Sequence, residues 1–430
     1  MITIFKRQRR AARLVLPVLA MAGVLALGAC SSGSSSGSQA SGGSQSGAAG
    51  GQTVTVWHYF SDPNQVALMD KYAQLFEAAH PGDKVDNVFV PYDQMNSKLV
   101  SAAGSKTGPD VVVFNGAEAA TLVLGGALAP MDTQLASFPE KSQLPDSVLH
   151  VVNGKTYAVQ GYVNLLGLWY NADILAKIGV KPPTTMDELE SDMGAAKAAG
   201  FSGITLSGLP NSQGEWQAYP WLSAAGFTYD NPDPKAMASG LARVRSWVTK
   251  GWLTQEAVTW DQTVPFQTFA AGNVAFAENG NWQMGTAKSD AKFKYGVVPL
   301  PVGGSGKVYL GGEGEGIGAF SKNPDLAWQY LTSSYLAPAG QLAAAQMVGS
   351  LPSRLDVAKD AQVTGDPLLV PFADTIAASG AAYPSSKIPP AGVAKVQLAV
   401  GQAWSAAISG QSSPDQAATT AVAAVKAAIG

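Results

Sequence analysis

The feature that most constrains the fold is a regular alternation of strand-like and helix-like segments in the first third of the chain. Three segments read as strands, at 53–57, 85–90 and 110–114. Three segments with helical spacing of apolar residues follow them in turn, at 62–80, 93–103 and 117–124. The last strand is continuously apolar, as expected of a parallel strand that is buried on both faces. This order predicts an α/β fold with a doubly wound parallel sheet and right-handed crossovers.

The loops after these strands are candidates for a binding site, because ligands bind beyond the carboxyl ends of the strands in such sheets. The loops carry aromatic, amide and carboxylate side chains, namely Trp57, His58, Tyr59, Tyr92, Asn115 and Glu118. The turn after the first strand reads WHYFSDP and lacks the glycine-rich pattern of a phosphate-binding loop. A nucleotide ligand is therefore disfavoured.

A second series of strand-like and helix-like segments begins near residue 160. It includes a strand at 165–170, a capping box at Thr185–Glu188 that opens a helix ending at Gly200, and a strand at 201–206. Further segments follow, a strand at 294–299 and helices at 241–250, 324–337, 339–347 and 391–428. Because a chain of 430 residues usually exceeds one domain, we expect two.

The first 29 residues have the pattern of a secretory signal. Five cations and no acidic residue precede an apolar run from Leu14 to Ala29. The run is shorter than the ~20 residues that a spanning helix needs. Arg9-Arg10 is compatible with twin-arginine export, but the rest of that pattern is missing, so the route of export stays open.

Leu27-Gly28-Ala29-Cys30 resembles the lipobox of bacterial lipoproteins. The resemblance implies cleavage before Cys30, lipidation of its thiol and attachment to the extracytoplasmic face of the cell membrane. The alternative is an ordinary signal peptide with an incidental cysteine. Residues 31–51 are almost entirely Ser, Gly, Ala and Gln, so we expect 30–51 to be a lipidated cysteine followed by a flexible tether.

Composition excludes some classes of protein. Cys30 is the only cysteine, so we expect no internal disulfide. Residues 1–29 hold five of the 28 basic residues and none of the 31 acidic ones, which leaves 23 against 31, a net charge of about −8. This charge and the lack of a later basic run argue against nucleic acid as a partner. We expect no metal and no cofactor.

Several ordered segments resemble motifs of the extracellular solute-binding proteins (family 1) of bacterial ABC importers, in the carbohydrate-binding group related to maltose-binding protein. The segments are 108–112 (GPDVV), 154–159 (GKTYAV), 169–173 (WYNAD), 183–189 (PTTMDEL), 269–275 (FAAGNVA) with 279–282 (NGNW), 298–301 (VPLP) and 349–354 (GSLPSR). Gln160 stands where the family usually has Pro, and Met186 where it usually has Trp. The motifs are weak singly but span nearly the whole chain after the tether.

The resemblance implies two doubly wound α/β lobes joined by a hinge, the type II arrangement of periplasmic binding proteins. Lobe one would comprise 52–160 plus 318–365, and lobe two 161–316 plus 366–430. Crossing segments would lie near 160–162 and within the glycine-rich stretch 311–316, where glycines permit large backbone changes. The implied partners are a carbohydrate, a permease pair with its ATPase, and the membrane through the lipid anchor. We expect a monomer.

A site for a sugar needs flat aromatic rings against the sugar faces, with amides and carboxylates beside the hydroxyls. Lobe one would contribute the loop residues named above. The other candidates come from lobe two and the crossings, namely Asn164, Glu215, Trp216, Tyr219, Trp221, Glu278, Asn279, Trp282, Gly312, Glu313 and Arg354. Trp282 is the leading candidate, because the family's Gly-x-Trp tryptophan commonly stacks on sugar; a core position is the alternative.

The remaining tryptophans divide by their local sequence. Trp216 lies in a stretch rich in Gly, Pro and Asn, which predicts a loop, so a buried ring there would need an explanation and both a binding and a structural role stay open. Trp247 and Trp252 lie on or beside a helix and are expected in the core, and Trp260 is undecided. His58 has no second histidine near it in sequence, so we expect it to form hydrogen bonds rather than bind a metal.

Two other functions compete with sugar binding. A glycoside hydrolase would use a facing pair of carboxylates, for which Glu278, Glu313 and Glu315 are available. The order of elements does not indicate an eight-fold barrel, and the resemblance is to binding proteins, so we expect no enzyme. A binder of another solute (polyamine, glycerol phosphate or peptide) and a surface adhesion or signalling protein also remain possible.

Overall fold

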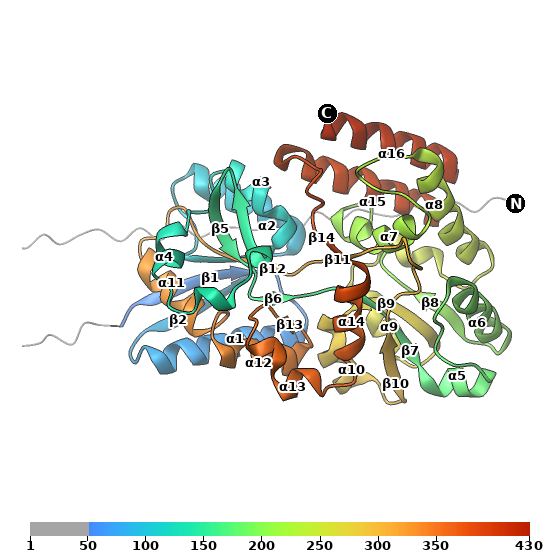
Figure 1. Ribbon diagram of the computed structural model, residues 1–430, viewed down its shortest axis with the longest axis horizontal. Helices are drawn as coiled ribbons and strands as arrows, with labels where there is room; N and C mark the ends of the chain where they lie inside the picture. The colour runs from blue at the N-terminus through green and yellow to red at the C-terminus, as the bar shows by residue number, and fades with distance from the viewer. Residues whose placement is uncertain (1–50) are drawn as a thin grey trace, which may run out of the picture. The chain divides into compact units, whose positions relative to one another are not determined.

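The computed structural model describes residues 51–430, which form two halves, each built on its own sheet (Figure 1). The first half, which holds the N-terminal strands, contains a six-stranded sheet. The order of strands is β2-β1-β3-β12-β5-β4. The strands are β1 (Thr53–His58), β2 (Lys84–Phe89), β3 (Val111–Asn115), β4 (Leu149–Val152), β5 (Lys155–Val159) and β12 (Glu313–Ile317). β1 pairs in parallel with β2 and β3, whereas β12 runs antiparallel between β3 and β5. The predicted parallel sheet is therefore confirmed for β2-β1-β3 only.

Helices cover both faces of this sheet, as a doubly wound fold requires. They are α1 (Pro63–Ala79), α2 (Tyr92–Gly104), α3 (Ala119–Leu124), α4 (Asp132–Ser137), α11 (Pro324–Ser333) and α12 (Pro338–Val348). Val111 and Val113 belong to one core cluster with Tyr72 of α1, and Val112 belongs to another with Leu99 of α2. Successive residues of β3 thus face opposite layers, which explains its continuous apolar run.

The second half is built on a four-stranded sheet in the order β10-β7-β9-β8. Its strands are β7 (Leu166–Asn171), β8 (Ser202–Thr205), β9 (Val274–Gly280) and β10 (Tyr295–Val298). β8 pairs in parallel with β9, and β7 runs antiparallel to both β9 and β10. This sheet is therefore mixed, with its own large core cluster.

The helices around the second sheet come from two stretches of the chain. They are α5 (Ala172–Ile178), α6 (Met186–Ala198), α7 (Ser212–Ala224), α8 (Pro234–Thr249), α9 (Thr263–Ala270), α10 (Met284–Asp290), α14 (Val370–Ser379), α15 (Val393–Ser409) and α16 (Pro414–Ile429). The predicted capping box at Thr185 and Glu188 is present at the start of α6. The single helix expected at 391–428 is two helices, because Gly410 ends α15 in the left-handed conformation.

Three segments of chain cross between the halves, as many as the predicted lobe boundaries require, although we located only two of them in the sequence. The first contains β6 (Tyr162–Val163), the second β11 (Val308–Leu310), and the third β13 (Leu351–Pro352). β6 pairs with β13, β11 pairs with β14 (Gly380–Ala382), and Asn164 pairs with Gly311. The crossings therefore lie side by side. In Figure 1 the orange helices α11 and α12 accordingly join the blue half, and the red helices α15 and α16 join the green half.

The glycine-rich stretch 311–316 differs from its prediction. We expected 311–316 to be a crossing and 161–316 to belong to lobe two, but β12 starts at Glu313 and lies inside the first sheet. A Cβ at Gly314 would lie 2.5 Å from the ring of Phe114, and one at Gly316 would lie 2.8 Å from the oxygen of Tyr157. These two glycines allow close packing. In this stretch only Gly312 has a left-handed φ, at 151°.

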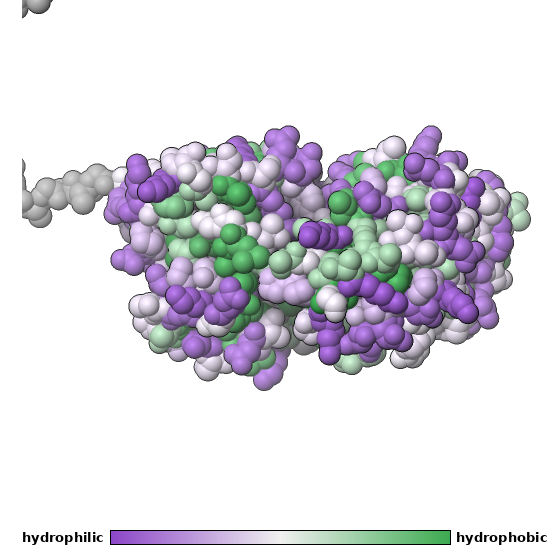
Figure 2. Space-filling view, turned by 90° about the horizontal axis from the view of Figure 1, so that it is seen from above, coloured by the Kyte–Doolittle hydropathy of each residue, from purple (hydrophilic) through white to green (hydrophobic). Residues whose placement is uncertain are grey.

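Seen from above relative to Figure 1, the surface carries patches of hydrophobic residues between hydrophilic ones (Figure 2). The most exposed large apolar side chains of the described residues include Val151 and Leu124, at 57% and 56%. Neither lines the cleft described below.

No helix among residues 51–430 combines the length and apolar character that a membrane crossing requires. The predicted signal, Cys30 and nearly all of the tether lie outside the described residues.

Candidate binding site

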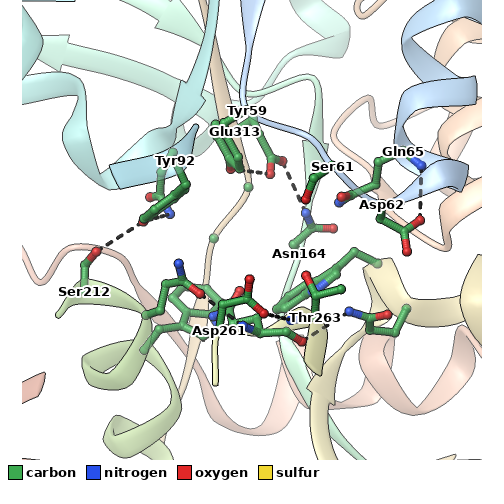
Figure 3. Close-up of a pocket in the computed structure, with 18 of the residues that line it drawn as sticks. Tyr59, Ser61, Asp62, Gln65, Tyr92, Asn164, Ser212, Asp261, Thr263 and Glu313 are labelled. Atoms are coloured by element: carbon green, nitrogen blue, oxygen red, sulfur yellow. Dashed lines mark hydrogen bonds between the residues drawn. The ribbon is translucent and has the colours of Figure 1, made fainter. Parts of the chain in front are cut away.

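A cleft lies where the two halves meet at the crossings (Figure 3). The first half lines it with Tyr59, Ser61, Asp62, Gln65, Tyr92 and Asn115. The second half lines it with Ser212, Gln213, Trp216, Asp261, Gln262, Thr263, Trp282, Gln283 and Tyr383. The crossings contribute Asn164, Gly311 and Gly312, and Glu313 comes from the start of β12 in the first sheet. The cleft thus receives side chains from both sheets and from the hinge.

The topology of the first sheet places three predicted residues in the cleft. Tyr59 follows β1, Tyr92 begins α2 after β2, and Asn115 ends β3. The carboxyl ends of these parallel strands meet at one edge of the sheet, which brings their loops together. The ring of Tyr59 packs edge-on against that of Tyr92 at 5.0 Å, and Asn115 Nδ2 donates to Tyr92 Oη at 3.3 Å.

Glu313 forms the acidic centre of the cleft. Its carboxylate accepts hydrogen bonds from Tyr59 Oη at 2.8 Å and from Asn164 Nδ2 at 3.3 Å. Burial raises the pKa of Glu313 to about 7, although hydrogen bonds from Tyr59 and Tyr162 oppose this rise. A carboxylate here can accept hydrogen bonds from hydroxyl groups of a bound solute.

Aromatic rings form the wall of the second half. The rings of Trp216 and Trp282 lie 6.5 Å apart with an interplanar angle of 53°, and Tyr383 packs edge-on against Trp216 at 4.6 Å. Trp282 is only partly buried, whereas Trp216 is 7% exposed. Gly311 has no side chain, and the ring of Trp216 occupies the space that a Cβ there would need.

Trp216 corrects one prediction about local structure. It lies in helix α7 rather than in a loop. Asn211 caps this helix by accepting a hydrogen bond from the backbone of Gln213, and the helix continues through Gly214 and Pro220. Burial of the helix on nearly every side outweighs the low helical propensity of these residues.

The charges in the cleft are all negative. Asp62, Asp261 and Glu313 line it, and none of its lining residues within the described chain is Lys, Arg or His. Asp62 accepts from the backbone of Asn64 at 2.9 Å, and Asp261 accepts from that of Thr263 at 2.9 Å. This arrangement disfavours an anionic solute, because a phosphate or carboxylate would meet like charges.

Hydrogen bonds beside the cleft join the two halves. Tyr92 Oη lies 3.2 Å from Ser212 Oγ, and Thr286 Oγ1 donates to Asp62 Oδ2 at 2.9 Å. Both pairs combine one residue from the first half with one from the second. The structure therefore has the two sides of the cleft in direct contact.

Glu215 and Tyr219, both predicted in the cleft, lie in the core behind its aromatic wall. Glu215 is 1% exposed and accepts hydrogen bonds from Tyr229 and Tyr309, each at 2.8 Å. Burial raises the pKa of Glu215 to about 7, against the opposing effect of hydrogen bonds from the surrounding tyrosines. The ring of Tyr219 stacks on that of Tyr309 at 3.9 Å. These residues support the wall and do not line the cleft.

Glu278, Asn279 and Trp221 are also core residues. Glu278 and Asn279 lie in β9, every residue of which is buried. Trp221 Nε1 donates to Glu278 at 2.7 Å, and Asn279 Nδ2 donates to the oxygen of Gln262 at 2.8 Å. β9 lies between β7 and β8 in the sheet and packs against α5, α6 and α9, and only Trp282 and Gln283, which follow its end, line the cleft.

Trp57, His58 and Glu118 lie outside the cleft. The ammonium group of Lys98 lies 4.7 Å from the ring centre of Trp57. His58 is 4% exposed, and burial lowers its pKa to about 4, although Asp70 opposes this shift. Glu118 lines a neighbouring pocket that shares Tyr59, Tyr92, Asn115 and Ser212 with the cleft.

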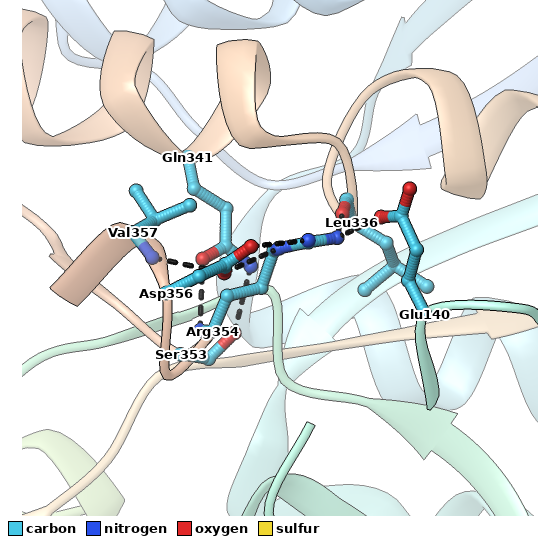
Figure 4. Close-up of polar contacts among 7 residues, drawn as sticks. All are labelled: Glu140, Leu336, Gln341, Ser353, Arg354, Asp356 and Val357. Atoms are coloured by element: carbon cyan, nitrogen blue, oxygen red, sulfur yellow. Dashed lines mark hydrogen bonds and ion pairs between the residues drawn. The ribbon is translucent and has the colours of Figure 1, made fainter. Parts of the chain in front are cut away.

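Arg354 anchors the third crossing to the first half instead of reaching the cleft (Figure 4). It is 2% exposed, forms an ion pair with Glu140 and donates to Asp356 Oδ2 at 2.7 Å. It also donates to the oxygen of Leu336 at 2.9 Å, and its backbone N–H donates to Gln341. A guanidinium group has five N–H donors in a rigid fork, so one arginine can pair with several acceptors at once.

The sequence did not point to several lining residues. They are Ser61, Asp62, Gln65, Ser212, Gln213, Asp261, Gln262, Thr263, Gln283, Gly311 and Tyr383. Asp62 caps α1, and Asp261 accepts hydrogen bonds from the backbone of Thr263 and Val264 at the start of α9. An aspartate that caps a helix beside the edge of a sheet is a sequence signal that could have identified Asp62 and Asp261.

Within residues 51–430 no group of three or more His, Cys, Asp or Glu could hold a metal ion.

Two α/β lobes, three crossings and an interlobe cleft define a type II binding protein of the periplasmic class. The chain belongs to the family of bacterial extracellular solute-binding proteins, whose family model matches residues 71–371. It is accordingly a binding protein and not an enzyme, because the similar proteins are solute-binding proteins.

Similar proteins agree with this class. The maltotriose-binding protein of Pyrococcus abyssi is 23% identical over 348 residues, 76% of this chain and 72% of that protein. The lactose-binding protein of Rhizobium radiobacter is 26% identical over 302 residues, 66% of this chain and 70% of that protein.

Among solved structures, the GacH receptor of Streptomyces glaucescens, determined unliganded and with acarbose, is 25% identical, with a TM-score of 0.78. The match covers 88% of this chain and 98% of that chain. Maltose-bound MalE3 of T. maritima is 22% identical with a TM-score of 0.78 over 87% of this chain and 99% of that chain, which shows a shared fold.

Proposed function

We propose that this protein is the substrate-binding lipoprotein of an ABC importer, and that it captures an uncharged di- or oligosaccharide in the interlobe cleft. The observation that carries the proposal is the composition of the cleft. Aromatic rings of Trp216, Trp282 and Tyr92 stand with the carboxylate of Glu313 and the amide of Asn164, without a cationic side chain among the described lining residues.

This composition suits the two kinds of surface that a sugar offers. Aromatic rings provide large flat contact areas for the C–H faces of a sugar. Carboxylate and amide groups pair with its hydroxyls, and hydrogen bonds to ionised groups are the stronger kind. Similar proteins that are named for maltotriose and lactose support a saccharide as the ligand.

Closure of the cleft would link capture to transport. A solute that contacts Tyr59 or Tyr92 on one lobe and Trp282 on the other favours the closed form over the open one. The closed protein then docks on a membrane permease pair driven by an ATPase. The implied lipid on Cys30 and the tether 30–51 would keep the protein near that permease at the extracytoplasmic face of the membrane.

A polyamine is the second candidate, because Asp62, Asp261 and Glu313 would attract a cation. Glycerol phosphate is disfavoured by the same three carboxylates. A peptide ligand would need partners for its two charged ends, and the described cleft offers none for its carboxylate.

A thermal-shift screen of the purified protein tests the proposal. The panel comprises neutral mono-, di- and oligosaccharides, with glycerol 3-phosphate, spermidine and a tripeptide as the competing classes. A ligand at 100 times its Kd adds about 2.7 kcal/mol to the stability, so a true ligand raises the Tm clearly. A shift from a neutral saccharide is the expected result. A shift from spermidine alone would replace the proposal.

A further inference from the structure

Asn281 is a buried residue outside the cleft whose side chain contacts two of the three crossings. Its Oδ1 accepts a hydrogen bond from the backbone N–H of Leu165 at 2.8 Å. Its Nδ2 lies within hydrogen-bond distance of three acceptors, the oxygen of Val163 at 3.2 Å, Asn164 Oδ1 at 3.2 Å and the oxygen of Gly349 at 2.8 Å. Leu165, Val163 and Asn164 belong to the first crossing, and Gly349 begins the third.

Asn164 carries this network into the cleft and to the second crossing. Its Oδ1 accepts from Asn281 Nδ2 and from Ser350 Oγ, the latter at 2.9 Å. Its Nδ2 donates to Glu313 at 3.3 Å. Its backbone N–H donates to the oxygen of Gly311 at 2.8 Å, and the N–H of Gly311 donates back at 2.8 Å.

The two donors on Asn164 Oδ1 decide which way its amide points. An amide has an oxygen that only accepts and a nitrogen that only donates, so two donors on one side hold the oxygen there. The nitrogen must then face the cleft side, where Glu313 accepts from it. Reversal of the amide would put its oxygen beside the Glu313 carboxylate and leave both donors of Asn281 and Ser350 without this acceptor.

We propose that Asn281 is a positioning residue: it fixes the orientation of the Asn164 amide in the cleft and holds the three crossings together. The first part rests on the proposed function, because it takes Asn164 and Glu313 as groups that face the solute. The second part rests on the hydrogen bonds alone. The buried amide of Asn281 thereby links the orientation of a polar group in the cleft to the packing of the three crossings.

Hydrogen exchange measured by mass spectrometry on the full chain tests the coupling without any ligand. In Asn281→Ala, amide exchange should rise at least tenfold in peptides from all three crossings, around residues 163–165, 311 and 350–351. Asn171→Ala is the matched control, since Asn171 is also a buried Asn (1% exposed) that caps α5 and bonds to the oxygen of Gly272. In Asn171→Ala, faster amide exchange should be confined to peptides around α5.

Ser350→Ala keeps the proposal testable if Asn281→Ala does not fold. This change removes one donor from Asn164 Oδ1 and leaves Asn281 intact, so the same peptides should exchange faster by a smaller factor. Faster exchange confined to the residues around the substituted position, in either variant, would overturn the coupling.

Asn281→Asp tests the orientation of the Asn164 amide. The new carboxylate cannot donate to Asn164 Oδ1, so the amide should turn toward it and away from Glu313. For a saccharide that the wild type binds in the thermal-shift screen, the affinity should fall at least tenfold. An unchanged affinity would overturn the positioning role. If no saccharide binds the wild type, the proposed function fails, and the exchange pattern still decides the coupling.

Discussion

The hydroxyl of Tyr92 lies 3.2 Å from that of Ser212, so the start of α2 and the start of α7 meet across the cleft. The pair Asp62 and Thr286 makes a second contact of this kind at 2.9 Å. Such bonds exist only when the lobes are close. They therefore contribute to the equilibrium between open and closed forms, whether or not a solute is bound.

Thr286→Val should shift this equilibrium toward the open form. The change keeps the shape of the side chain but removes the hydroxyl that donates to Asp62, and Thr286 does not line the cleft. A hydrogen bond of this kind contributes about 1 kcal/mol, which corresponds to a shift of about fivefold. Small-angle X-ray scattering should show a larger radius of gyration.

Thr268→Val is the control for this experiment. Thr268 donates to the oxygen of Val264 within α9, so its hydroxyl makes no contact between the lobes. The control should scatter like the wild type. Equal radii for wild type and Thr286→Val would mean that this bond does not govern closure.

Trp282→Ala should weaken saccharide binding about tenfold or more, about 1.4 kcal/mol, because the cleft loses its most accessible tryptophan ring. Titration calorimetry measures the change. Trp328→Ala is the control, since Trp328 is also partly buried but packs on Phe138 in the first lobe, with ring centres 5.8 Å apart. An affinity that survives Trp282→Ala would remove this ring from the site.

Stability should fall as the pH rises from 5 to 8. Burial raises the pKa of Glu215 to about 7, above its ordinary value of 4.5, so the folded protein keeps a proton that the unfolded chain releases in this range. The free energy of unfolding then decreases with pH between these values and levels off above 7. Burial also raises the pKa of Glu278 and Glu313, and their effects have the same sign.

Glu215→Gln isolates the contribution of this group. The amide cannot ionise, so the loss of stability between pH 5 and pH 8 should be smaller than in the wild type by on the order of 2 kcal/mol. Urea denaturation at the two pH values measures it. A variant that loses as much stability as the wild type would show that Glu215 titrates normally.

Cys30→Ala should abolish attachment to the membrane. The lipobox interpretation makes the thiol of Cys30 the site of acylation, so the variant should lose labelling by radioactive fatty acid and either remain uncleaved or leave the membrane fraction. Ser31→Ala is a suitable control, because it changes the neighbouring residue and keeps the thiol. Fatty acid labelling that persists without Cys30 would contradict the lipoprotein interpretation.

The sequence was sufficient to place three residues on one side of the cleft. Tyr59, Tyr92 and Asn115 follow strands that an alternating pattern identifies, and parallel strands end at one edge of a sheet. The position of each residue then follows from topology alone. Asn164, in the first crossing, and Glu313, at the start of β12, came from the family resemblance, and the structure brings them to the same cleft.

The other side of the cleft depends on packing that no local pattern reveals. Asn279 lies in a motif of the family and Glu278 directly precedes it, but full burial of β9 turns them into core residues. Tyr383 reaches the cleft from a segment far along the chain, through the pairing of β14 with β11. Polar residues in the core and polar residues in a site look alike in sequence, because both types form hydrogen bonds.

Titration calorimetry with the neutral saccharide that most raises the Tm tests the central claim most directly. The account predicts one saccharide bound per protein, with the sugar recovered unchanged afterwards by chromatography, and weaker binding in Trp282→Ala. Cleavage of the sugar, or heat of binding from spermidine with none from any neutral saccharide, would contradict it.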